Sequence, residues 1–232
     1  IKAEKHKLKD IVQELMEYKK TSTNMPFLFR DIEEEFLSEL QDLFGDKVEY
    51  EEDVNNFDYI YSTAELIELS GRKFHGKKNH YNSFVKNYDY EIKDIKEENI
   101  GQQCIFFARQ WLENKDNVSF QLQYELKVIE DMIHNLSNLN LEGMAVKVNN
   151  EIAAFTLGEK LNENMSVIHI EKGNNDYKGV YAFINRMFLN NYFKDVATVN
   201  RQEDLGVKGL KKAKQSYNPI RLEKKYNVNI NL

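Results

Sequence analysis

Cations and hydrogen-bonding side chains are concentrated between Gly71 and Phe84. If this segment is helical from Lys77 onward, its first turn carries positive charge, although a helix N-terminus favours anions by roughly 0.3–1 kcal/mol. A bound phosphate or carboxylate would resolve this conflict, because helix N-termini and cations both attract anions. We therefore predict an anion-binding segment, against the alternative of a solvated basic surface. The residues expected to bind are Arg72, Lys73, His75, Lys78, Asn79 and Asn82.

A second group of reactive side chains lies where a predicted strand ends and a predicted helix begins, over residues 169–185. Ligands collect at the carboxyl ends of strands in open α/β sheets. Glu171 could serve there as a general base, and Tyr177 or Tyr181 as a general acid. Gly179 would let a ligand approach the first helical turn. An ordinary place in an alternating strand is the equal alternative for Glu171. Lys172 and Asn185 complete this predicted ligand-binding set.

The third stretch, residues 200–219, also begins where a predicted strand ends. Arg201 could grip a carboxylate or phosphate through two parallel hydrogen bonds. Glu203 or Asp204 could hold an amine. Asn200 and Tyr217 are the remaining polar side chains of this stretch that we assign to the site.

A short basic helix is predicted inside this third stretch. Lys211 and Lys214 are three residues apart, so they share one face of that helix. Leu210 and Ala213 are expected on its buried side. The alternative is a capped surface helix with a lysine face.

Other common kinds of active site are absent from the sequence. The histidines are scattered and Cys104 is the single cysteine, so the spacing of a zinc site is missing. There is neither a Walker loop, nor a Gly-x-Gly-x-x-Gly loop, nor a serine nucleophile elbow. We therefore expect no metal and no cofactor. Cys104, among apolar neighbours, is interpreted as a small buried hydrophobe rather than a nucleophile.

Composition bounds the class of protein. The chain has 232 residues, of which 41% are hydrophobic and 12% aromatic, enough for one large core or two small ones. A single cysteine allows no internal disulfide, and no apolar run approaches the roughly 18 residues of a membrane span. We expect a soluble cytoplasmic protein, and the sequence leaves its oligomeric state open. The net charge of −6 argues against general nucleic-acid coating, so the local basic segments predict a defined anionic ligand.

Hydrophobic periodicity places these stretches on an alternation of helices and strands. Capping boxes are predicted at Asp31 with Glu34 and at Ser62 with Glu65. Asn149-Asn150 is predicted to turn a hairpin, because asparagine tolerates positive φ. The expected helices are Leu8–Tyr18, Ile32–Phe44, Ser62–Gly71, His75–Asn87, Ile100–Leu112, Leu122–Ile133, Tyr177–Phe193 and Lys208–Gln215. The expected strands are Phe27–Phe29, Lys47–Tyr50, Phe57–Tyr61, Tyr88–Ile95, Gly143–Val148, Ile152–Leu157, Ser166–Glu171, Val196–Val199 and Arg221–Asn229.

The order of elements in the second half resembles the core of a GNAT-type acyltransferase. Three meandering strands lead into a helix and then into a parallel strand. The first half offers a shorter set of strands and helices. We therefore predict an α/β fold of two tandem GNAT-like domains, with mixed central sheets flanked by helices. The predicted domains are residues 1–114, incomplete at the start, and residues 115–232.

Several motifs together resemble the phosphatidylglycerol lysyltransferase C-terminal-domain family, which is related to the Fem-type aminoacyltransferases. The resemblance covers most of the chain after about residue 30. The motifs are Phe57–Tyr61, Leu69–His75, Lys78–Phe84, His169–Asn174, Tyr177–Tyr181, Ile184–Asn185, Val199–Gly206 and Gly209–Pro219.

The resemblance implies a fold and an activity. The family has two tandem GNAT-like domains. Better-known members pass an aminoacyl group from a charged tRNA to a phosphatidylglycerol hydroxyl at the cytoplasmic membrane face. The partners it implies are aminoacyl-tRNA and anionic lipid at a membrane surface. This chain departs from the family in lacking transmembrane helices.

Three functions stay open at this stage. The first is an aminoacyl-tRNA-dependent transferase, in which the basic segment positions phosphate and Tyr217 lies near the reacting centre. In it, Glu171, Asn200 and Arg201 bind the amino acid or the acceptor. The second is a coenzyme-A-dependent N-acyltransferase, which would need a pantetheine slot near Ile170 and Val199. The predicted turn lacks the glycines that cradle the coenzyme pyrophosphate. The third is a non-catalytic module that binds an anionic partner.

Overall fold

The computed structural model describes residues 5–22, 24–115 and 119–231. The chain forms two compact units. Unit 1 comprises Ile1–Tyr59, Glu203–Lys212 and Arg221–Leu232, and unit 2 comprises Ile60–Gln202 and Ala213–Ile220. No helix in the described residues is both long enough and apolar enough to cross a membrane.

Unit 1 is a small sheet covered by two helices. Its strands are β1 (Phe29–Ile32), β10 (Tyr226–Ile230) and β2 (Val48–Glu52), antiparallel and in that order. Helices α1 (Lys5–Ser22) and α2 (Glu34–Phe44) bury apolar side chains against β10. Short 3-10 turns η1 (Gly45–Lys47) and η2 (Val54–Asn56) and strand β9 (Arg221–Glu223) complete this unit. Its core consists of Leu8, Val12, Met16, Leu37, Leu40, Tyr226, Val228 and Ile230.

Unit 2 contains a longer run of elements. In chain order they are α3 (Thr63–Glu68), η3 (Arg72–Phe74), α4 (His75–Asn87), β4 (Tyr90–Asp94), α5 (Ile100–Glu113), α6 (Phe120–His134), β5 (Glu142–Val148), β6 (Glu151–Asn162), β7 (Met165–Gly173), α7 (Val180–Tyr192) and β8 (Thr198–Asn200). Two further elements, β3 (Asp58–Ser62) and α8 (Lys208–Gln215), contain residues of both units.

The larger sheet of the described residues has the strand order β4-β5-β6-β7-β8-β3-β9. Strands β5, β6 and β7 form an antiparallel meander, and β8 returns parallel to β7 after α7. This is the meander, helix and parallel strand that the sequence predicts. The mixed α/β fold, with helices flanking a mixed sheet, is thereby confirmed.

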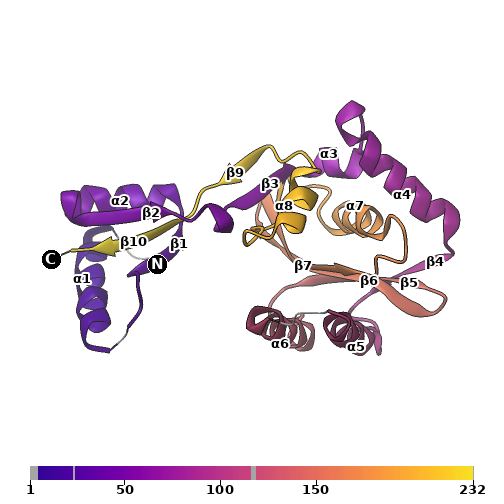
Figure 1. Ribbon diagram of the computed structural model, residues 1–232, viewed down its shortest axis with the longest axis horizontal. Helices are drawn as coiled ribbons and strands as arrows, with labels where there is room; N and C mark the ends of the chain where they lie inside the picture. The colour runs from indigo at the N-terminus through magenta and orange to yellow at the C-terminus, as the bar shows by residue number, and fades with distance from the viewer. Residues whose placement is uncertain (1–4, 23, 116–118, 232) are drawn as a thin grey trace. The chain divides into compact units, whose positions relative to one another are not determined.

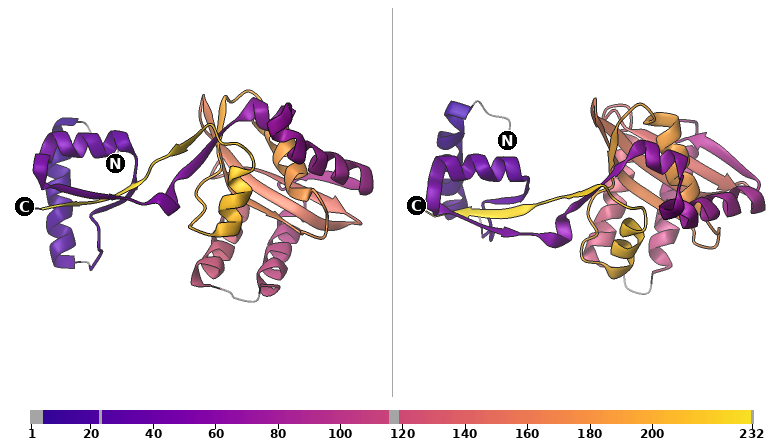
Figure 2. Two further views of the ribbon diagram at one scale, coloured as in Figure 1. Left: turned by 45° about the horizontal axis from the view of Figure 1, so that its top comes forward. Right: turned by 90° about the horizontal axis from the view of Figure 1, so that it is seen from above.

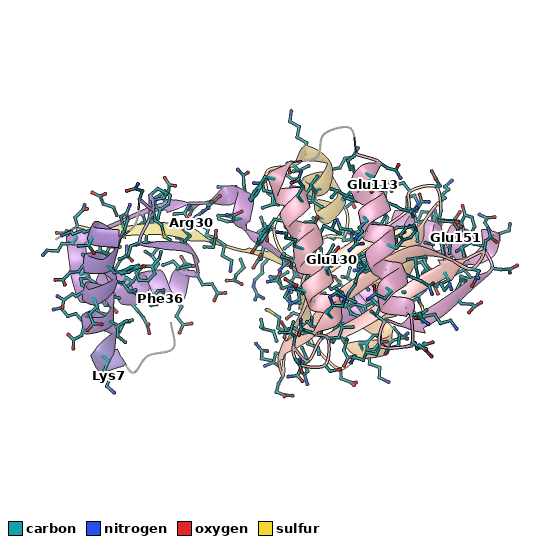
Figure 3. The ribbon with its side chains drawn as sticks, turned by 90° about the horizontal axis from the view of Figure 1, so that it is seen from below. Lys7, Arg30, Phe36, Glu113, Glu130 and Glu151 are labelled. Carbon is teal, nitrogen blue, oxygen red and sulfur yellow. The ribbon has the colours of Figure 1, made fainter. Side chains whose placement is uncertain are left out.

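Helices cover both faces of this sheet in unit 2. Figure 1 shows α5 and α6 below β5–β7, with α4 and α7 above them. Both views of Figure 2 show α5 and α6 side by side, in agreement with their mutual contacts. Figure 3, seen from the α5–α6 side, shows Glu130 on α6 and Glu113 at the end of α5, so charged side chains occupy the outer surface of this layer.

Two apolar layers hold these helices on the sheet. On the α5–α6 face, the core includes Ile105, Ile129 and Phe155. On the α7 face, the rings of Phe84 and Phe183 lie 4.6 Å apart between centroids. Such aromatic pairs add about 0.5–1.5 kcal/mol beyond burial, so α4 and α7 are firmly joined.

Two of the predicted turns and caps are present in the structure, and one is not. Asn149 and Asn150 adopt φ of 51° and 68° in the β5–β6 turn, and the Ser62 side chain accepts a hydrogen bond from the Glu65 N–H, as predicted. The Asp31 capping box is wrong. Helix α2 begins after Glu33 without a side-chain cap, because Asp31 lies in β1 with a φ of 56°.

The buried side predicted for the basic helix is also wrong. Helix α8 has no buried residue among those described, and Leu210 is 39% exposed. Ala213 is exposed too. A helical pattern gives the spacing of apolar residues but does not show whether another element covers them.

The units do not follow the predicted division at residue 114. Helices α5 and α6, which lie on either side of that position, share one core with β5 and β6. Unit 1 also contains segments from both ends of the chain. The division into two tandem GNAT-like domains stays a prediction.

Candidate functional site

The site begins where the short strand β8 ends beside its parallel neighbour β7. Strands β7 and β8 pair from Met165 with Thr198 to Val167 with Asn200, and no further. Beyond this point, Glu171 of β7 and Arg201, directly after β8, face one another. The Arg201 Nη2 atom lies 2.7 Å from Glu171 Oε1, and the two side chains are only 11% and 10% exposed. An ion pair thus joins β7 to the segment that directly follows β8.

Asn185 of α7 fixes the other oxygen of this carboxylate. Its Nδ2 atom donates to Glu171 Oε2 at 2.9 Å, and Asn185 is buried. Glu171 therefore has both oxygens engaged, one by Arg201 and one by Asn185, and its role as a general base stays a prediction. Strand alternation explains the placement, since Glu171 points toward α7.

Tyr217 joins two cations at this site. The Arg201 guanidinium carbon lies 4.4 Å from the centroid of the Tyr217 ring, and Lys77 Nζ lies 3.7 Å from it. Cations favour such positions over an aromatic ring, more strongly where water is excluded. Lys77 belongs to the first turn of α4, so all three predicted stretches of sequence meet here.

Backbone contacts hold the segment that carries Arg201. Lys214 Nζ donates hydrogen bonds to the carbonyl oxygens of Arg201 and Gln202. The Tyr61 hydroxyl donates to the Lys214 carbonyl at 2.8 Å. Asn218 Nδ2 donates to the Lys73 carbonyl at 3.2 Å, which ties the chain beside Tyr217 to η3.

Burial shifts the titration of the groups around Tyr217. The pKa of Lys77 is lowered to about 8 by desolvation and by the nearby Arg201 charge, against the attraction of Glu171. Desolvation raises the pKa of Tyr217 to about 12, although the Arg201 charge opposes it. Arg201 Nη1 is buried without a well-aligned hydrogen-bond partner among the described residues. The site therefore contains donors with capacity for a further acceptor.

The chain was also compared with models of known protein families. A family model described as phosphatidylglycerol lysyltransferase, C-terminal, matches residues 3–229. The chain belongs to this family. The resemblance predicted from the motifs is thereby confirmed.

Two solved structures are similar to this phosphatidylglycerol lysyltransferase C-terminal-family chain. A crystal structure of a conserved protein of unknown function from Bacteroides thetaiotaomicron is 32% identical, with a TM-score of 0.88 over 97% of this chain and 76% of that one. The C-terminal domain of a candidate lysylphosphatidylglycerol synthetase from Agrobacterium fabrum is 13% identical, with a TM-score of 0.66 over 97% and 73%. The latter likeness shows the fold alone.

A curated relative is longer than this family member. An uncharacterized protein of Mycoplasmoides gallisepticum is 28% identical over 174 residues, which are 74% of this chain and 56% of the relative. The chain thus matches little more than half the length of that protein.

The N-terminus of α7 is closed by α4 in this family member. Gly179 adopts a φ of 92°, and a Cβ there would lie 2.0 Å from the His80 carbonyl oxygen. The glycine therefore admits the α4 backbone, whereas the sequence analysis expected it to admit a ligand. Tyr177 packs edge-on against Tyr88, while the Tyr181 hydroxyl both donates to and accepts from the backbone of Gly173.

Other predicted site residues have different surroundings. Lys172 lies on the opposite face of the sheet from Glu171, where it pairs with Glu125 at 3.0 Å and lies over the Trp111 ring. In unit 1, Asp204 is buried and accepts a 2.6 Å hydrogen bond from Tyr59, so it is engaged already. Asn200 Oδ1 accepts from the Gln202 N–H at 2.6 Å.

The remaining predicted residues lie at the surface. Lys73 pairs with Glu65 at 2.7 Å, and Glu203 is half-buried. The exposed ones are Arg72, Lys73, His75, Lys78, Asn79, Asn82 and Lys211. They lie on η3, α4 and α8.

Sequence reasoning left two contributors out of the site. Lys77 lies within the basic stretch, but the sequence analysis predicted its neighbour Lys78 as the binding residue. Helical periodicity could have separated them, since Lys77 shares a face with the buried Phe74 and Phe84. Tyr61, whose ring centroid lies 5.6 Å from the Arg201 guanidinium carbon, carries no local signal beyond a strand pattern.

No cluster of metal-ligating side chains occurs within residues 5–22, 24–115 and 119–231. Cys104 is buried in the α5–α6 core, and desolvation raises the pKa of its thiol to about 12. It is packed as a hydrophobe, which agrees with the sequence interpretation.

Proposed function

We propose that this chain is an acyltransferase that moves an aminoacyl group from a charged tRNA to a hydroxyl or amine acceptor. The observation that carries the proposal is the buried Arg201–Glu171 pair at the end of β8, with Lys77 and Tyr217 beside it. Family membership supports the aminoacyl donor. Phosphatidylglycerol is the acceptor that the family description favours.

The proposed step is an acyl exchange. The bond between the aminoacyl carbonyl carbon and the ribose oxygen of the tRNA breaks, and a bond from that carbon to the acceptor oxygen or nitrogen forms. One proton passes from the acceptor to the released ribose hydroxyl. Negative charge develops on the carbonyl oxygen, so a prepositioned donor lowers the barrier.

Arg201 is the residue best suited to stabilise that charge. Glu171 and Asn185 hold its orientation, and its Nη1 atom has donor capacity left over. Removing one such donor from an acyl-transfer site typically costs about 10²–10³ in rate. Tyr217 packs on the guanidinium and restricts its motion.

The packing at α7 supports aminoacyl-tRNA over coenzyme A as the donor. In coenzyme-A users, amides of the corresponding turn cradle the pyrophosphate. Here the α4 backbone approaches Gly179 so closely that a single methyl group would collide with it. The exposed cations of η3 and α4 offer instead a surface for the phosphates of a tRNA acceptor end.

The proposal is tested by an aminoacyl-transfer assay. Purified protein is mixed with tRNA carrying a radiolabelled amino acid and with phosphatidylglycerol vesicles, and the label is followed into the lipid fraction. A soluble glycerol acceptor and acetyl-coenzyme A as donor are run in parallel. Transfer that depends on Arg201 is expected. Transfer from acetyl-coenzyme A alone, or from neither donor, would refute the aminoacyl-tRNA assignment.

A further inference from the structure

We propose that Lys77 and Arg201 together bind one singly charged phosphodiester group, and that Lys77 must be protonated for this binding. The inference rests on the proposed function for the class of ligand, since tRNA and phosphatidylglycerol both carry phosphodiesters.

The charges in the cluster do not balance. Arg201 is paired with Glu171, whose second oxygen is held by the neutral Asn185. Lys77 contacts the Tyr217 ring, a neutral group. Among the residues that the structure describes, one positive charge thus remains without an anion paired to it, on the half-buried Lys77. A buried charge without a partner is costly, and one anion would compensate it.

Two donors are available to that anion. Arg201 Nη1 is buried and lacks a well-aligned partner among the described residues, and its two N–H groups leave one for this anion beside the one that the proposed transfer uses. Lys77 and Arg201 contact the same Tyr217 ring, at 3.7 Å and 4.4 Å from its centroid. A phosphodiester presents two terminal oxygens, so it can accept from both cations at once.

Titration of Lys77 follows from its surroundings. Its pKa is lowered to about 8 by desolvation and by Arg201, so a bound anion would raise it again. Binding of the anion should therefore be accompanied by proton uptake on Lys77 above about pH 8. The ionisable groups that act on Lys77 and Tyr217 from other elements are Glu171, Arg201 and Tyr181, and Tyr61 acts on Arg201. On α4 itself, His75 and Lys78 are exposed.

The linkage between anion binding and protonation of Lys77 is measured with dimethyl phosphate. This ligand stays a monoanion between about pH 6 and pH 10. Backbone amide shifts of the whole protein are titrated by NMR at pH 7 and at pH 9. With a Lys77 pKa of about 8, the wild-type affinity should fall about tenfold between these values. The Lys77→Arg variant, whose charge is fixed, should bind dimethyl phosphate equally at both pH values. The Lys77→Met variant should bind it weakly at both pH values.

Controls separate this site from general charge attraction. Lys127→Arg changes an exposed lysine of α6, which covers the opposite face of the sheet from α4, and should behave as wild type. Acetate replaces dimethyl phosphate as a second monoanion, and equal affinity for it would overturn the phosphodiester assignment. A wild-type affinity that does not change with pH, or a Lys77→Arg variant that keeps the tenfold fall, would overturn the proton linkage.

Two further probes identify the source of the phosphodiester. The dinucleotide CpA represents the tRNA end, and glycerophosphoglycerol represents the lipid headgroup. Tighter binding of either than of dimethyl phosphate supports the proposal and assigns the source. Because these titrations do not involve transfer, an absence of transfer would overturn only the proposed function.

Discussion

Arg201 and Glu171 lie 2.7 Å apart across the point where β7 and β8 cease to pair, each only about a tenth exposed. The pair is joined to α7 through Asn185 and to Tyr217 through the guanidinium face. It therefore links the sheet, a helix and the C-terminal segment of unit 2.

Replacing only one partner of this ion pair should lower the free energy of unfolding. In Glu171→Gln the Arg201 charge loses its partner in a buried place, and we expect a loss of about 3–5 kcal/mol of unfolding free energy. Denaturant titration followed by circular dichroism measures it.

The double variant Glu171→Met/Arg201→Met is the matched control. It removes both charges, so it should recover much of the lost stability while abolishing the proposed transfer. A Glu171→Gln variant as stable as wild type would show that the carboxylate does not compensate Arg201.

The close approach of α4 to α7 predicts that Gly179 tolerates no side chain. Gly179→Ala places a methyl group 2.0 Å from the His80 carbonyl oxygen at a positive φ. We expect a loss of about 2–4 kcal/mol in unfolding free energy. Gly209→Ala in α8, where the added methyl meets nothing within 4 Å, should instead stabilise by about 0.5–1 kcal/mol. Equal effects of the two substitutions would contradict the packing.

Two tyrosines predict a loss of stability in alkali. The pKa values of Tyr59 and Tyr217 are raised from 10.0 to about 12, chiefly by desolvation. The unfolded chain therefore releases these protons first, so their contribution is complete below pH 10 and is lost as pH rises from 10 to 12. Urea midpoints measured across this interval should fall, and Tyr59→Phe should reduce the slope. A flat profile would argue against burial of both hydroxyls.

Cys104 should be chemically inert in the folded protein. Its thiol is buried, and its pKa of about 12 leaves almost no thiolate at neutral pH. Labelling by a disulfide reagent should proceed only as fast as the protein unfolds, measured by absorbance with and without denaturant. Cys104→Ala should retain any transfer activity. Rapid labelling under native conditions would place the thiol at the surface.

The sequence alone determined the order and type of most elements. Alternating and helical patterns found the β5–β6–β7 meander and α7, and Asn149-Asn150 marked a turn that needs positive φ. The motifs also identified the family, because long runs of matching residues need no coordinates. These features depend on local spacing, which a linear chain records.

The tertiary structure decided which polar residues meet. Glu171 and Lys172 are neighbours in sequence, yet the strand places them on opposite faces of the sheet. Lys77 reaches Tyr217, 140 positions along the chain, while the adjacent Lys78 stays exposed. Pairing across such separations depends on the packing of α4 on α7 and on the parallel pairing of β7 with β8. No local pattern of residues records either of these.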